Sequence, residues 1–103
     1  TQGFDLTFTF ANKGNFTNGA NTIPMTNIAL NRLSGTIGTG LTAPVNQVVT
    51  LDIDGEWLWD PGATQSTETT NLLLELKCDW PDAYNYMAGF YSESITATLS
   101  IGL

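Results

Sequence analysis

The stretch 4–11, FDLTFTFA, decides the fold class, because apolar and polar residues alternate along its whole length. One face of this stretch carries four large apolar side chains, which are Phe4, Leu6, Phe8 and Phe10. The opposite face carries Asp5, Thr7 and Thr9. A period of two residues is typical of a β-strand that buries one face. We therefore expect a half-buried strand over these residues.

Alternation returns at 45–53, 71–80 and 90–103, and each of these stretches predicts a further strand. Residues 25–33 predict another, with a bulge or a strand end where the pattern slips at Leu33. Leucine, glutamate and lysine make a helix the competing interpretation of 71–80, but strict alternation over the whole stretch favours a strand. Cys78 falls within its apolar row and is interpreted as a small core residue.

The remaining segments are rich in turn-forming residues. Residues 12–22 predict a long loop with a tight turn at Asn18-Gly19, and 34–44 support at most a short edge strand. Residues 61–70 and 81–89 predict loops, the second with at most one helical turn. The pattern predicts an all-β fold, namely a two-sheet antiparallel β-sandwich, Ig-like or jelly-roll-like, with about six or seven strands. The length of 103 residues fits a single domain over 1–103.

The charge balance bears on location and partners. Charged residues make up only 13% of the chain, about half of the usual share, so residues that favour surface helices are scarce. The net charge of −7, with only Lys13, Arg32 and Lys77 positive, argues against nucleic acid as a partner. No apolar run is long enough for membrane insertion. A chain that starts at Thr1 fits a product released from a signal peptide, and we expect an extracellular or cell-surface location.

The residue types that most catalytic sites need are scarce. The chain has no histidine and one cysteine, so zinc, haem, Ser-His-Asp chemistry and an internal disulfide are not expected. A glycosidase needs two carboxylates across a cleft, and a sandwich of this size has little depth for one. We therefore predict that the protein is not an enzyme and uses no cofactor other than, in one interpretation, calcium.

Residues 50–62, TLDIDGEWLWDPG, form the chemically densest stretch of the chain. If Asp54-Gly55 forms a two-residue hairpin turn, Trp57 and Trp59 share an outward polar face with Asp52. That face would be a platform for stacking a sugar ring, with Asp52 orienting its hydroxyls, or a subunit interface. If the turn is longer and spans 52–56, both tryptophans point into the core. The sequence leaves both interpretations open.

The same stretch holds acids that resemble part of a calcium loop, and these are Asp52, Asp54, Glu56 and Asp60. Their spacing does not match a full EF-hand. A surface calcium site completed by Asp79, by Asp82 or by another chain is one interpretation, and a solvated acidic face is the other.

The stretch AGFYSESITATLSI, residues 88–101, resembles the closing strand of extracellular fibre subunits. These are the spore-coat-U-like pilins of archaic chaperone-usher pili and, more loosely, camelysin-like biofilm fibre proteins. The resemblance implies a secreted β-sandwich building block in which residues 1–11 act as a donor strand. In that role Phe4, Leu6, Phe8 and Phe10 would fill a neighbour's groove; the alternative is that the strand pairs within its own subunit. Such pilins usually carry a disulfide, whereas this chain has only Cys78.

We therefore predict a non-catalytic structural subunit of an extracellular or cell-surface filament, which assembles with itself by strand donation or edge pairing. The alternative is a small carbohydrate-binding module that binds polysaccharide through Trp57 and Trp59. A viral or phage surface domain would share the fold.

Overall fold

The computed structural model describes residues 4–38, 42–60, 70–81 and 86–101. These residues form eight strands: β1 (Phe4–Phe10), β2 (Asn15–Thr17), β3 (Thr22–Pro24), β4 (Asn27–Thr36), β5 (Gln47–Val48), β6 (Glu56–Trp59), β7 (Thr70–Asp79) and β8 (Ile95–Ile101). The all-β prediction is confirmed. Nowhere in these four ranges is there a helix long and apolar enough to span a membrane.

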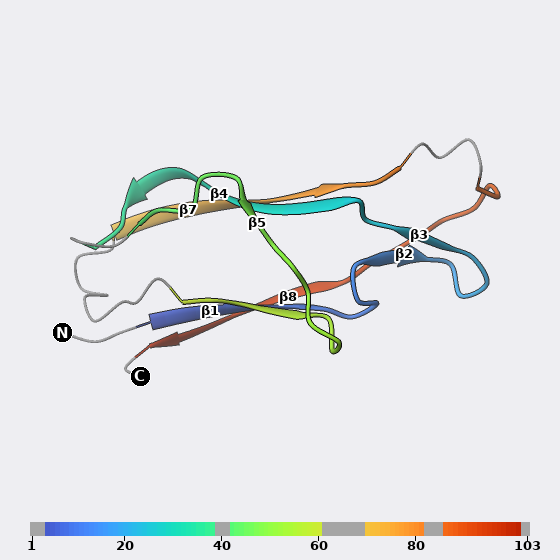
Figure 1. The fold of residues 1–103 in the computed structure, drawn as a ribbon, viewed down its shortest axis with the longest axis horizontal. Helices are drawn as coiled ribbons and strands as arrows, with labels where there is room; N and C mark the ends of the chain where they lie inside the picture. Colours follow the sequence, from blue (N-terminus) through green and yellow to red (C-terminus); the bar gives the residue numbers. More distant parts are fainter. Residues whose placement is uncertain (1–3, 39–41, 61–69, 82–85, 102–103) are drawn as a thin grey trace.

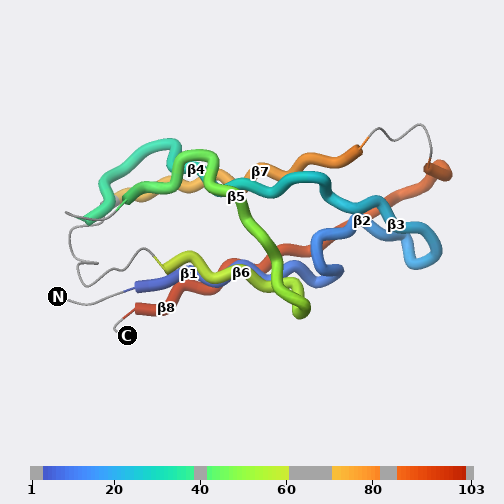
Figure 2. The backbone as a smooth tube through the Cα atoms, in the orientation of Figure 1, coloured from blue at the N-terminus to red at the C-terminus, as the bar shows by residue number. Residues whose placement is uncertain are grey.

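The strands form three antiparallel sheets, whereas the sequence predicted two. The β1 sheet has the order β6-β1-β8, the β4 sheet has the order β5-β4-β7, and β2 pairs with β3 alone. Figures 1 and 2 show the β1 sheet and the β4 sheet as two layers, with β2 and β3 beyond one end of them. The additional sheet arises because residues 12–22, predicted as a loop, contain β2 and lead into β3.

The hydrophobic core lies between the two layers. Its buried members are Phe4, Phe8, Phe10 and Trp59 from the β1 sheet, Ile28 and Leu30 from β4, and Val49. Phe10 and Leu30 are the most deeply buried of these, at 1% and 0% exposed. Leu6 packs against the same cluster, so the apolar row predicted for β1 faces the core along its whole length.

β1 is the central strand of its sheet. It pairs with β6 over residues 6–9 and with β8 along its full length, from Phe4 opposite Ile101 to Phe10 opposite Ile95. Residues 4–10 therefore pair within their own chain. This is the alternative arrangement, in which the strand pairs within its own subunit. The donor-strand role stays a prediction from the resemblance.

The slip predicted at Leu33 is a bulge. The pairing of β4 with β7 shifts register between Arg32 and Ser34, and again between Ser34 and Thr36. Gly35 has φ of 91° there, and a Cβ on it would lie 2.2 Å from the backbone oxygen of Asn71. Glycine is therefore required where the two backbones approach each other.

The strand predicted at 45–53 is wrong for most of its length. Only Gln47–Val48 pairs with β4, after Asn46 takes a φ of 47°. The chain then leaves the β4 sheet and crosses to the β1 sheet, as Figure 1 shows. Val49 is buried in this crossing, whereas Ile53 is exposed in the following turn. The apolar alternation therefore reflects a crossing between layers and not one continuous strand.

Candidate functional site

The acidic turn, residues 52–56, is a hairpin loop of three residues. The amide of Asp52 donates to the carbonyl of Glu56 at 2.9 Å, and the amide of Gly55 donates to the carbonyl of Asp52 at 3.0 Å. Gly55 has φ of 78°, as expected for the glycine that follows the turn in such loops. The two-residue turn at Asp54-Gly55 is therefore wrong, and the longer turn over 52–56 is confirmed.

Contact with β1 explains the choice of the longer turn. The amide of Phe10 donates to the carbonyl of Gly55 at 2.8 Å. A Cβ at Gly55 would lie 2.7 Å from the carbonyl oxygen of Phe10, so only glycine fits this close approach. The turn thus brings the start of β6 against the end of β1.

The longer turn points both tryptophans inward. Trp59 is 4% exposed and meets the Phe4 ring edge-on, with ring centroids 6.0 Å apart. Trp57 is half-buried and stacks on Phe8 at 6.1 Å. Leu58, which lies between them, is the exposed residue of β6. The prediction of an outward platform formed by Trp57, Trp59 and Asp52 is therefore wrong, because one residue of difference in the turn reverses the faces of the strand.

The acids of the turn are close together. Single carboxylate oxygens of Asp52, Asp54 and Glu56 all lie within 4.8 Å of one another, and Asp52 and Asp54 are exposed. Asp52 Oδ1 already accepts hydrogen bonds from the amides of Asp54 and Glu56, both at 2.9 Å. Glu56 Oε2 accepts a bond from Thr9 Oγ1 at 3.3 Å. These bonds give the cluster a structural role in the turn.

The predicted calcium ligands do not all come together. Asp60, at the far end of β6, and Asp79, at the end of β7, are not part of the acidic cluster. Asp82 lies outside the described residues. Calcium binding stays a prediction from the sequence.

Among the described residues, the side of the two layers along β7 and β8 is open, and we call it the open side. β8 is an edge strand of the β1 sheet and β7 an edge strand of the β4 sheet. Leu99 and Ile101 of β8 are both 58% exposed, although their partners Leu6 and Phe4 in β1 face the core. Directly paired residues project from the same face of a sheet, so these two side chains point between the layers and yet remain accessible.

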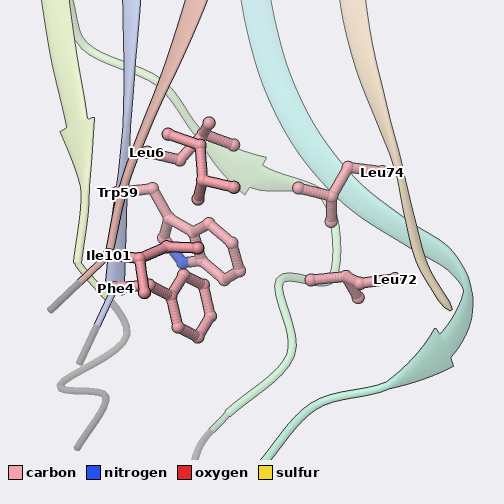
Figure 3. A pocket seen from close by; sticks show the side chains of 7 residues that line it. Phe4, Leu6, Trp59, Leu72, Leu74 and Ile101 are labelled. Atoms are coloured by element: carbon pink, nitrogen blue, oxygen red, sulfur yellow. The ribbon is translucent and has the colours of Figure 1, made fainter. Parts of the chain in front are cut away.

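An apolar cavity of about 280 Å³ lies between the layers at this side. It is lined by Phe4, Leu6, Trp59, Leu99 and Ile101 from the β1 sheet and by Leu72 and Leu74 from β7. Figure 3 shows Leu72 and Leu74 projecting toward Trp59, Phe4 and Ile101 across the gap. Within the described part of the chain, the layers therefore do not close on each other along the β7 and β8 edges.

The opposite side, along β5 and β6, is closed by the crossing segment, residues 49–55, which links these two strands. The amide of Val49 donates to the carbonyl of Ile28 at 2.8 Å, and the Val49 side chain is buried. At the other end of the crossing, Gly55 accepts the bond from Phe10. The chain itself thus covers this side of the core.

Glu93 is a structural residue that the sequence analysis missed. Its Oε1 accepts bonds from the amides of Asn12 and Ser94, both at 2.8 Å, and its Oε2 accepts one from the amide of Gly14 at 3.0 Å. The carboxylate thus fastens the turn after β1 to the segment that leads into β8. Asn12 and Gly14 lie 81 and 79 residues away in the sequence, so no local signal marks this role.

Cys78 packs against the core cluster from β7, as predicted. Partial burial raises the pKa of its thiol, and the nearby carboxylates of Asp79 and Glu93 raise it further. A thiol with a raised pKa is a weak nucleophile at neutral pH. The environment of Cys78 therefore suits a packing role.

No protein-family model, curated protein or solved structure matches the chain. Any statement about function therefore rests on the residues and their geometry.

Proposed function

We propose that the protein is a non-catalytic structural subunit of an extracellular or cell-surface filament, which assembles with copies of itself by pairing open strand edges. The observation that carries the proposal is β8, a seven-residue edge strand with exposed apolar side chains on its core-facing side. An edge strand of this kind presents unpaired backbone groups and apolar surface together, and both favour addition of another strand.

Edge pairing replaces strand donation as the mechanism. β1 is held between β6 and β8 in its own chain, so its withdrawal would break pairing on both sides and expose buried phenylalanines. β8 can instead accept a neighbour without any change in its own fold. The energetic gain comes from new backbone hydrogen bonds and from burying Leu99 and Ile101.

The chemical environment of the polar groups supports a non-catalytic role. The chain has no histidine, and its single thiol has a raised pKa. The carboxylates of Asp52 and Glu93 accept backbone hydrogen bonds within turns. An extracellular location is supported by the composition, which is poor in charge and rich in threonine and asparagine.

Negative-stain electron microscopy of the purified protein, beside its mass in solution over a range of concentrations, tests the proposal. We expect filaments or large oligomers, and we expect Leu99→Lys to abolish them, because the substitution places a charge on the open edge. Leu33→Lys is the matched control, since Leu33 is 52% exposed but lies on the central strand β4. A wild-type protein that stays monomeric at millimolar concentration would overturn the proposal.

A further inference from the structure

We propose that β8 pairs antiparallel with β8 of a second copy about a two-fold axis at Thr98, which joins the two β1 sheets into one continuous sheet. This contact rests on the proposed edge pairing and names the partner strand and its register. Because a two-fold contact closes into a dimer, it forms the dimeric unit, and growth of a filament from that unit uses a second edge. The joined sheet has the order β6-β1-β8-β8-β1-β6. The core-facing sides of the two copies lie on the same face of this sheet.

The sequence of β8, ITATLSI, has the symmetry that such a contact needs. Apolar residues occupy 95, 97, 99 and 101, and hydroxyl residues occupy 96, 98 and 100. Reversing the strand about Thr98 places every apolar residue opposite an apolar residue and every hydroxyl opposite a hydroxyl. An isologous two-fold contact requires this self-complementarity.

The proposed register defines the cross-strand pairs. Ile95 lies opposite Ile101 of the second copy, and Ala97 lies opposite Leu99 of the second copy. Each of these pairs occurs twice and covers side chains that are exposed in the single chain, including Leu99 and Ile101 at 58%. On the other face, Thr98 lies opposite Thr98 of the second copy, where hydroxyl pairs contribute to sheet stability.

Charge favours a second copy at this strand. Residues 95–101 carry no ionisable side chain, although the chain as a whole has a net charge of −7. The nearest acid in the sequence is Glu93, whose carboxylate accepts bonds from the amides of Asn12 and Gly14 of its own chain. Two copies of β8 can therefore approach without placing like charges opposite each other.

The other edges of the two layers are poorer sites for pairing. β7 is long, but it carries Glu75, Lys77 and Asp79, and its pairing with β4 is bulged. Charges and bulges are the features that protect edge strands from pairing with other chains. β6 has four residues and β5 only two. Among the described strands, β8 is the long, regular and uncharged edge.

Disulfide trapping tests both the contact and its register. Thr98→Cys is made in a Cys78→Ala background, so that the new thiol is the only one in the chain. Cβ atoms directly opposite each other in an antiparallel pair are close enough for a disulfide after a small adjustment. We expect the Thr98→Cys protein to form covalent dimers at least about tenfold faster than a Thr22→Cys control, because Thr22 is exposed on β3 and away from the contact.

Two further variants fix the register. Thr96 lies opposite Ser100 of the second copy, so a mixture of Thr96→Cys and Ser100→Cys should yield mixed dimers. Thr96→Cys alone should react as slowly as the control, because its two copies are four residues apart along the strands. Dimers formed equally by all positions of β8 would overturn the proposed register.

The outcomes separate this contact from the proposed function. Filaments in the wild type without rapid trapping at Thr98 would overturn the β8 contact and leave edge pairing at another strand. Rapid trapping in a wild type that grows no larger than a dimer would support the contact and overturn the filament. A strict monomer without trapping would overturn both.

Discussion

β1 and β8 share one sequence pattern and differ in their surroundings. Both alternate apolar and hydroxyl or acidic residues over seven positions, and they pair with each other along their whole length. Yet Phe4, Phe8 and Phe10 of β1 are buried, whereas Leu99 and Ile101 of β8 are more than half exposed. β1 has a neighbour on each side, and β8 has one.

The difference shows what an alternating pattern means. Alternation specifies which face of a strand turns toward the interior, but not whether another layer covers that face. Coverage depends on what lies over that face, since Trp59 is 4% exposed on β6 although β6 is also an edge strand. The apolar row of β8, which the described residues leave more than half exposed at Leu99 and Ile101, is therefore accessible for a contact with another molecule.

The largest expected effect compares two residues that lie opposite each other, Phe10 and Ile95. Phe10→Ala should destabilise the fold by about 3–5 kcal/mol, because it leaves a cavity in the closed part of the core. Ile95→Ala should cost about 1 kcal/mol, because the side chain is partly exposed before the change. Urea unfolding monitored by tryptophan fluorescence measures both. Equal losses would contradict the contrast between the two strands.

The next effect concerns the link between the end of β1 and the start of β8. Glu93→Ala should destabilise the protein by about 2–3 kcal/mol, because two amides on the turn after β1 lose a charged acceptor. Glu93→Gln is the matched control and should lose less, since one carbonyl oxygen remains. Thermal unfolding followed by circular dichroism compares the three proteins. If the alanine variant matched the wild type, the carboxylate would not hold the two strands together.

A smaller effect is expected at the turn that brings β6 beside β1. Asp52→Ala should cost about 1 kcal/mol, because Oδ1 accepts two backbone bonds in the turn. Asp52→Asn retains an oxygen acceptor and should be close to the wild type. The comparison is made by urea unfolding below pH 8. A large loss in the asparagine variant would show that the charge, and not the acceptor, stabilises the turn.

The smallest expected effect is the contribution of Cys78, a partly buried residue of β7, to the pH dependence of the unfolding free energy. The pKa of the thiol is raised in the folded protein, so the folded state holds this proton where the unfolded state has lost it. The protonated thiol therefore contributes to the free energy of unfolding at pH values below the thiol pKa of the unfolded state. This contribution is lost as the pH rises through the thiol pKa of the folded state. Cys78→Ala should therefore show a shallower decline in unfolding free energy at alkaline pH. If the unfolding free energies of the two proteins declined equally with pH, the thiol would lie in a more solvated environment than the structure shows.

The sequence predicted the strands whose pattern is long and regular. β1 and β7 lie where alternation placed them, and the slip at Leu33 is a bulge in β4. β8 is shorter than the predicted 90–103, since the strand begins at Ile95 and Phe90 is fully exposed. Regular alternation succeeds because side-chain direction in a strand is a local property.

The predictions from the sequence fail where contacts between residues far apart in the chain determine the local structure. The loop at Gly55 has three residues because Phe10 approaches its backbone, and this contact turns Trp57 and Trp59 inward. The segment 45–53 alternates but crosses between sheets. Glu93 acts on residues at the other end of the chain. Nothing in the local sequence indicates these distances, so pattern alone could not predict the tryptophan face or the Glu93 contacts.

The pairing of β1 with β8 also determines when the β1 sheet can be completed during synthesis. β1 precedes β8 in the chain, and the two strands that pair along their whole length are far apart in the sequence. Until β8 is made, the phenylalanine row of β1 has only the short strand β6 beside it within its sheet. Contacts that span so much chain form slowly, and an uncovered apolar strand is prone to join the wrong partner meanwhile. The β1 sheet of this protein is therefore expected to be completed only after β8 has emerged.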